Sequence, residues 1–146
     1  MRNLLLMSFV MLLVGCSHFV PIKGNGRYAH LKSPYGTVFG QVETPSPEAC
    51  ILEARQFKNG AGFLSKIDAE CSEKSFDHEM PWMVKQTNVF TGITTTYRFR
   101  TRSFCAQLAS EASKQMSEEQ KKIWAVSDCI VDPSCDYCTG KRVPDF

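Results

Sequence analysis

The sequence predicts a small α+β domain in which a short antiparallel sheet is packed by about three helices and stabilised by disulfide bonds. The segments Trp82 to Phe90 and Ile93 to Arg100 flank Thr91-Gly92 and are typical of a β-hairpin. Three other segments carry apolar residues at helical spacing. Six cysteines follow the first sixteen residues, and an even number is typical of a disulfide framework.

The first elements expected in this domain are a strand and a helix. Tyr35 to Val42 has the composition of a strand, although its two glycines weaken the pattern. Ser46 is a favourable N-cap, and Pro47 suits the first position of a helix. Asn59-Gly60 is a natural end. The sequence therefore predicts a helix over residues 47–58.

The middle of the chain is expected to contribute the rest of the sheet. Phe63 to Asp68 alternates weakly and predicts a short strand, whereas residues 68–80 are polar and irregular. In the hairpin, the second strand has the clearer alternation, because its side chains separate into two sets. One side carries Ile93, Thr95, Tyr97 and Phe99, and the other carries Thr94, Thr96, Arg98 and Arg100.

Two helices are expected after the hairpin. The first covers about residues 103–115. The second opens at Ser117, where a glutamine three residues later completes a capping box, and its apolar side runs through Ile123 and Trp124 to a point before Pro133. Residues 131–146 form a cysteine-bearing tail. The sequence shows no internal repeat.

The N-terminal segment has the composition of an export signal. Arg2 precedes an apolar run from Leu4 to Val14, which is shorter than the roughly 20 residues that a membrane-spanning helix needs. The run closes on Leu13-Val14-Gly15-Cys16. The segment resembles the signal peptide of a bacterial lipoprotein, and Leu13 to Cys16 match its lipobox.

The resemblance implies that residues 1–15 are removed and that Cys16 becomes a lipid-bearing N-terminus. Diacylglycerol on its sulfur and a chain such as palmitate on its amine would anchor the protein in a lipid bilayer. Ser17 after the cysteine, in place of Asp, favours the outer membrane over the inner one, with the domain facing the periplasm. Simple secretion is the alternative. Residues 16–28 are expected to be a flexible tether, and residues 29–146 a single domain.

Charge and size restrict the partners. The 146-residue chain has a net charge of +2, and removal of residues 1–15 leaves 131 residues with one more basic than acidic side chain. This balance argues against nucleic-acid binding. The expected partners are the bilayer and an envelope protein or glycan.

Six cysteines permit 15 disulfide pairings. Cys105 and Cys129 lie at similar distances on either side of Ser117, so an antiparallel pair of helices would bring their sulfurs together. We therefore expect Cys105–Cys129, with Cys50–Cys71 next. Cys135–Cys138 then remains as a local bridge, although Cys50 or Cys71 can instead pair with the tail.

Cys135-Asp136-Tyr137-Cys138 also matches the C-x-x-C pattern of thiol–disulfide oxidoreductases. Such a site normally begins a helix after a strand, where the helix dipole lowers the thiol pKa, and this context is missing here. A structural bridge is therefore the favoured interpretation. A zinc site built from Cys129, Cys135 and Cys138 would need a fourth ligand. A c-type haem would need histidine at position 139, which is threonine. No metal and no cofactor are predicted.

Two polar clusters remain. Asp77-His78-Glu79 contains acid–base groups, but adjacent side chains seldom converge, so a solvated loop is expected. Arg98, Arg100 and Arg102 share one side of a strand and its exit, and form a candidate docking surface for phosphate or carboxylate. The favoured alternative is that these arginines only occupy the solvent-exposed face of a sheet.

These features predict a non-catalytic binding module of the bacterial cell envelope. A more specific form is an inhibitor or immunity protein against an envelope-targeting hydrolase. The alternative function is a thiol–disulfide oxidoreductase that uses Cys135 and Cys138.

Overall fold

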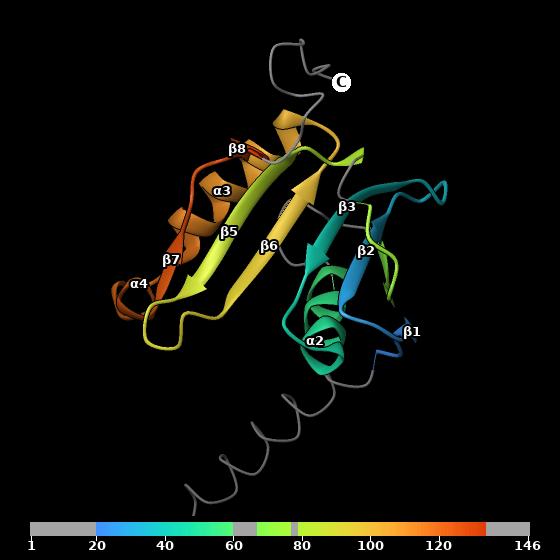
Figure 1. The fold of residues 1–146 in the computed structure, drawn as a ribbon, viewed down its shortest axis with the longest axis horizontal. Helices are drawn as coiled ribbons and strands as arrows, with labels where there is room; N and C mark the ends of the chain where they lie inside the picture. The colour runs from blue at the N-terminus through green and yellow to red at the C-terminus, as the bar shows by residue number, and fades with distance from the viewer. Residues whose placement is uncertain (1–19, 60–66, 77–78, 134–146) are drawn as a thin grey trace, which may run out of the picture.

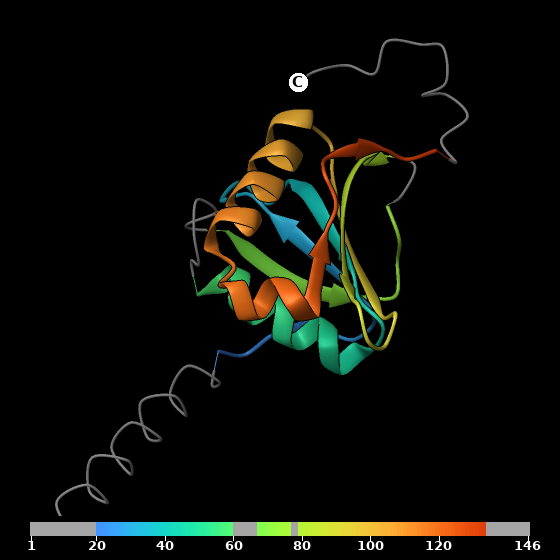
Figure 2. The same cartoon turned by 90° about the vertical axis from the view of Figure 1, so that its left-hand side faces the viewer.

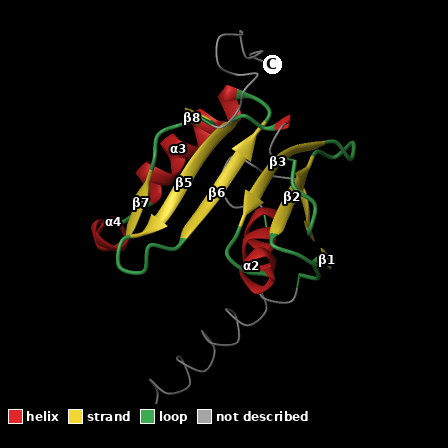
Figure 3. Ribbon diagram, viewed as in Figure 1, coloured by secondary structure: helices red, strands yellow, loops and turns green. Residues whose placement is uncertain are grey.

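The structure, a computed structural model, describes residues 20–59, 67–76 and 79–133 (Figure 1). The described residues form one eight-stranded sheet and three helices (Figure 3). None of these helices has the length and apolar character needed to cross a membrane. The helices are α2 (Pro47–Lys58), α3 (Arg102–Gln115) and α4 (Glu118–Ile123), and the strands are β1 (Lys23–Gly24), β2 (Tyr28–Lys32), β3 (Val38–Glu43), β4 (Asp68–Ser72), β5 (Trp82–Asn88), β6 (Thr94–Phe99), β7 (Trp124–Val126) and β8 (Ile130–Val131).

The strands follow the order β1-β4-β2-β3-β6-β5-β7, and β8 also pairs with β5. All pairs are antiparallel except β1 with β4. The mixed composition of strands and helices agrees with the predicted class, but the sheet is larger than the short sheet that we expected. Helices α2 and α3 cover the same face, since both line one pocket over β5, β6 and β7 (Figure 2).

The sheet contains the same arrangement of elements twice. In each half a hairpin is followed by a helix and later by a strand that pairs with the first hairpin strand: β2-β3-α2-β4 and β5-β6-α3-β7, with the short helix α4 inserted before β7 in the second half. Each helix carries a cysteine as its fourth residue, Cys50 or Cys105. The two ββαβ units join side by side through β3 and β6. This repetition was not recognised in the sequence, because it is a repetition of topology and not of residues.

The core lies between the helices and the sheet. Phe99, at the end of β6, is fully buried and stacks near Phe104 of α3. Its ring lies over β3 at Gly40, where a Cβ atom would be only 3.0 Å from two ring carbons. Glycine at this position therefore allows the two units to approach closely at their shared seam.

The opposite face of the sheet is partly covered by the segment after β4. The buried Gln41 accepts a hydrogen bond from the backbone N–H of Phe76 (2.8 Å), and its Nε2 lies 3.4 Å from Ser75 Oγ. His30 Nε2 lies 2.7 Å from the carbonyl oxygen of Lys74, and the His30 and Phe76 rings are 4.8 Å apart. Burial lowers the pKa of His30 below its usual value, although the Lys74 contact opposes this effect.

Helix α2 forms over the predicted residues, but other elements differ. The second C-terminal helix does have its capping box at Ser117, yet it ends at Ile123, and Trp124–Val126 forms a strand paired with β5. Residues 68–72 form β4 instead of an irregular segment. Strand β2 was not predicted at all, and the expected strand from Tyr35 begins only at Val38.

The expected flexible tether over residues 16–28 is wrong for the part that the structure describes. Lys23–Gly24 joins the sheet as β1, and Ile22 packs against the core. The carbonyl oxygen of Val20 accepts a hydrogen bond from Arg55 Nε at 3.0 Å. Residues 20–28 therefore belong to the folded body.

A candidate ligand pocket between two helices

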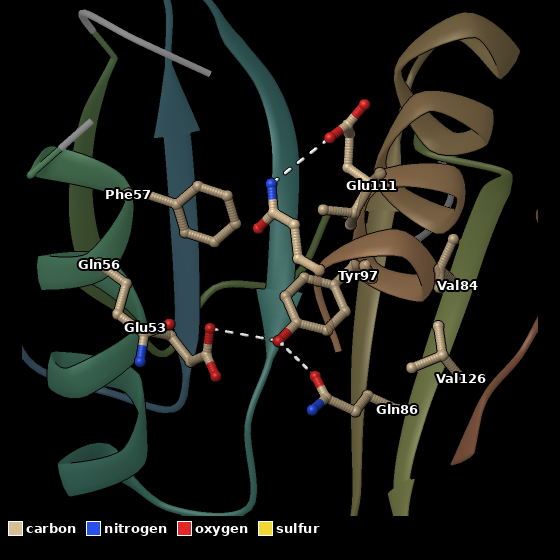
Figure 4. A pocket seen from close by; sticks show the side chains of 11 residues that line it. Glu53, Gln56, Phe57, Val84, Gln86, Tyr97, Glu111 and Val126 are labelled. Carbon is tan, nitrogen blue, oxygen red and sulfur yellow. Dashed lines mark hydrogen bonds between the residues drawn. The ribbon is translucent and has the colours of Figure 1, made fainter. Parts of the chain in front are cut away.

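The described part of the chain contains a pocket of about 180 Å³ between α2 and α3 (Figure 4). Strands β5, β6 and β7 form its floor, so both ββαβ units contribute to it. The pocket has an apolar floor and a polar rim. The lining residues are Glu53, Gln56 and Phe57 of α2, Val84 and Gln86 of β5, Tyr97 of β6, Leu108, Glu111, Ala112 and Gln115 of α3, and Val126 of β7.

Helical periodicity places these side chains. On α2, Glu53, Gln56 and Phe57 are three and four residues apart and therefore share one face. On α3 the lining residues recur at the same spacing from Leu108 to Gln115. The two helices thus present matching mixed faces across the floor of the sheet.

The polar groups at the rim are two carboxyls and three carboxamides, and none of the described lining residues is basic. Gln115 Nε2 donates to Glu111 Oε2 at 3.4 Å on the α3 side. On the α2 side the hydroxyl of Tyr97 lies 3.2 Å from both Glu53 Oε2 and Gln86 Oε1. The rim is therefore rich in acceptor oxygens.

Burial controls the ionisation of the group centred on Tyr97. Burial raises the pKa of the Glu53 carboxyl, and the hydrogen bond from Tyr97 opposes this shift. Burial, followed by the charge of Glu53 and this same hydrogen bond, raises the pKa of Tyr97 well above its usual value. Tyr97 therefore stays protonated at neutral pH, and its single proton serves only one of its two acceptors at a time. The other acceptor is open to a donor from a ligand.

Two disulfides fix the walls of the pocket. Cys50–Cys71 links the first turn of α2 to β4, and Cys105–Cys129 links the first turn of α3 to the segment after β7. They are the two pairings expected from the sequence. The reason given for the second was wrong, because Cys129 does not lie on a helix: the bond ties α3 to the sheet. With separations of 21 and 24 residues, each should stabilise the fold by about 3 kcal/mol.

Arg98 lies on the opposite face of the sheet from the pocket, because it alternates with Tyr97 and Phe99 on β6. Its side chain is only 11% exposed and pairs with Asp132, which is 9% exposed, at 2.5 Å. Arg98 therefore connects the segment after β8 to the sheet.

Arg100 and Arg102 are also engaged within the chain. Arg100 donates from Nε to the carbonyl oxygen of Val38 and from Nη2 to Glu79 Oε2, both at 2.7 Å. The Arg102 guanidinium lies 5.8 Å from the centre of the Trp82 ring. The structure therefore does not place the three arginines in one open cluster, and a docking role for them stays a prediction.

Other predicted site residues lie outside the described part of the chain. These are Cys16, Asp77, His78, Cys135 and Cys138. Within residues 20–59, 67–76 and 79–133, no group of three or more His, Cys, Asp or Glu side chains is placed to hold a metal ion.

Sequence reasoning missed the pocket. The apolar floor was partly foreseen, since Tyr97 was expected with Phe99 on the side of its strand opposite Arg98 and Arg100. The polar rim was not, because Glu53 and Glu111 lie 58 positions apart and read as ordinary surface residues of two separate helices. The one available signal was a mixed polar and apolar face at i, i+3, i+4 and i+7 on α3.

Comparison with protein-family models, with curated proteins and with solved structures finds no match for this chain. The chemistry of its own residues is therefore the basis for assigning a function.

Proposed function

We propose that this protein is a lipid-anchored lipoprotein of the bacterial cell envelope that acts as a non-catalytic binding module, and that the pocket between α2 and α3 is its ligand site. The observation that carries the proposal is a pocket whose two helical walls are each attached to the sheet by a disulfide. Because its walls are already ordered, such a site loses little conformational entropy when a ligand binds. Inhibition of, or immunity to, an envelope-targeting hydrolase is a specific form of this function.

The lining favours a ligand that donates hydrogen bonds and carries positive charge. Glu53 and Glu111 supply carboxyls on opposite walls, and apolar carbon comes from Phe57 and Leu108 of the walls and from Val84 of the floor. A protonated amine on a short aliphatic chain meets both requirements, because the ammonium group has three donors and no acceptor. The volume of about 180 Å³ is somewhat larger than an apolar cavity of about 150 Å³ that binds benzene. The pocket therefore suits one basic side chain or one amino-bearing unit of an envelope protein or glycan.

A titration followed by NMR tests the ligand site. N-acetyl-lysine amide is the probe, and N-acetyl-norleucine amide is the matched control, because it keeps the aliphatic chain and lacks the amine. We expect amide shifts at residues of α2, α3 and β5 with the lysine probe only. The double variant Glu53→Gln/Glu111→Gln should lose them, whereas Glu118→Gln, on exposed α4, should keep them. Equal responses to both probes, or none at millimolar concentration, would contradict the proposal.

Thiol trapping separates this function from a thiol–disulfide oxidoreductase. A binding module predicts that Cys135 and Cys138 are fully oxidised and hard to reduce in envelopes. A redox enzyme predicts a mixed population that exchanges with small disulfides. Intact mass of the purified protein tests the lipid anchor at Cys16 separately.

A further inference from the structure

An apolar cluster is exposed where the β5–β6 turn meets α4. Val89, Phe90 and Ile93 of the turn are 51%, 78% and 50% exposed, and Ile123 at the end of α4 is 40% exposed. The backbone N–H of Val89 donates to the carbonyl oxygen of Ile123 at 2.9 Å, so the turn lies directly beside the end of α4. We call these four residues the apolar tip.

The turn has a defined conformation that holds Phe90 in solvent. Asn88 Oδ1 accepts from the N–H groups of Phe90 and Thr91 at 3.0 and 3.1 Å, and the N–H of Gly92 donates to the carbonyl oxygen of Asn88 at 2.8 Å. Gly92 adopts a φ of +71°, which glycine adopts readily. The exposure of Phe90 is thus imposed by a hydrogen-bonded turn and is not the result of a loose loop.

The folded body begins close to the proposed anchor. Because Val20 and Pro21 accept hydrogen bonds from α2 and Lys23 is already in the sheet, only four peptide links separate Cys16 from Val20. Such a length spans at most about 14 Å. An acylated Cys16 therefore keeps the start of the body next to the lipid headgroups.

The apolar tip lies on the same side of the molecule as the start of the described chain. Figures 1 and 2, which differ by a quarter turn, both place the β5–β6 turn and β1 on the lower side, although Figure 1 shows them at opposite ends of this side. The β2–β3 turn lies on the upper side in Figure 1, because β3 pairs antiparallel with β6. That turn carries Tyr35, which is 95% exposed. The equivalent hairpins of the two ββαβ units thus point in opposite directions.

We propose that the apolar tip inserts into the interfacial region of the bilayer that holds the anchor, so that the domain has a fixed orientation on the membrane. This inference rests on the proposed lipid anchor. Four apolar side chains bind a membrane weakly alone, but the short connection to Cys16 makes their insertion intramolecular and raises the effective lipid concentration. Insertion of Phe90 and its neighbours into lipid removes their apolar surface from water. Packing within the folded domain leaves this surface exposed.

Quenching of tryptophan fluorescence by lipid tests the inference. The mature acylated protein is reconstituted in vesicles whose acyl chains carry bromine, which quenches tryptophan on contact. The Phe90→Trp variant reports on the apolar tip, and the Tyr35→Trp variant is the matched control at the opposite hairpin. Trp82 and Trp124 give the same background in both. We expect the added fluorescence of Phe90→Trp to be quenched at least about twofold more than that of Tyr35→Trp.

Equal quenching of the two variants would overturn the inference, as would the absence of quenching in both. Ile93→Trp serves as a second reporter at the tip if Phe90→Trp does not fold. The mass spectrum of the same sample separates two failures. An acylated protein without preferential quenching refutes only the membrane contact of the tip, whereas a protein without acyl chains refutes the anchor and with it this inference. Dimers in solution that bury the tip would likewise refute it in favour of a second copy.

Discussion

Replacement of Gly40 by alanine should destabilise the protein at the seam between its two ββαβ units. Gly40 lies on β3 opposite Phe99 of β6, and a Cβ at this position would be 3.0 Å from Cδ1 and Cε1 of the Phe99 ring and 3.2 Å from Leu31 Cδ1. Both neighbours are fully buried. The Phe99 ring therefore has little space into which it can move.

The size of the effect follows from these distances. Carbon atoms in cores pack at about 3.5–4.0 Å, so the ring or the strand must move by at least about 0.5 Å. Overpacking of this kind costs about 1–3 kcal/mol. Alanine restricts the unfolded chain more than glycine does, which offsets about 0.4–1 kcal/mol. The middle of each range leaves a net loss of about 1.3 kcal/mol in the free energy of unfolding and a fall of about 3–7 °C in Tm.

Equilibrium unfolding in urea, followed by circular dichroism with the disulfides intact, measures this loss. The variant Phe99→Leu provides the control, because the smaller side chain leaves room for the new methyl group. In a double-mutant cycle, Gly40→Ala should cost at least about 0.5 kcal/mol less in the Phe99→Leu background. If Gly40→Ala is as stable as the parent, or costs the same in both backgrounds, the close packing of the seam is refuted.

Three further results are expected. Replacement of Cys105 and Cys129 by serine should lower the free energy of unfolding by about 3 kcal/mol, and an unchanged urea midpoint would contradict this. Because burial lowers the pKa of His30 in the folded state, unfolding should become easier as the pH falls below about 6.5, and His30→Gln should weaken this dependence in denaturation series at pH 5 to 8. Tyr97→Phe removes the hydrogen bond that lowers the pKa of Glu53, so the pKa of this carboxyl should rise further in a ¹³C NMR titration; a fall would exclude Tyr97 as its donor.

The position of the pocket follows from the doubled topology. Each unit contributes a helix on the same face of the sheet, and the two helices are separated by the seam of β3 and β6. A single unit would have one wall only. The binding site that we propose is therefore a property of the pair of units, and loss of the seam should affect it together with stability.

The local signals in the sequence determined the elements that depend on local interactions. Ser46 accepts a hydrogen bond from the N–H of Ala49, and Pro47 occupies the first helical position, so α2 forms over the expected residues. The alternation of Tyr97 and Phe99 with Arg98 separated the core face of β6 from the opposite one. The two expected cysteine pairings are present in the structure, although Cys105–Cys129 was expected for the wrong reason. The helix cap and the strand alternation depend only on residues a few positions apart in the chain.

Only the tertiary structure decided the elements whose partners lie far away in the chain. Ile123-Trp124-Ala125-Val126 carries apolar residues that suit a helix or a strand, and pairing with β5 settled it as a strand from Trp124. Strand β4 consists of small and polar residues, and it forms between β1 and β2 because the ladder satisfies its backbone hydrogen bonds. The pocket and the apolar tip arise in the same way, since no local pattern states which surfaces two distant helices or a turn and an anchor will share.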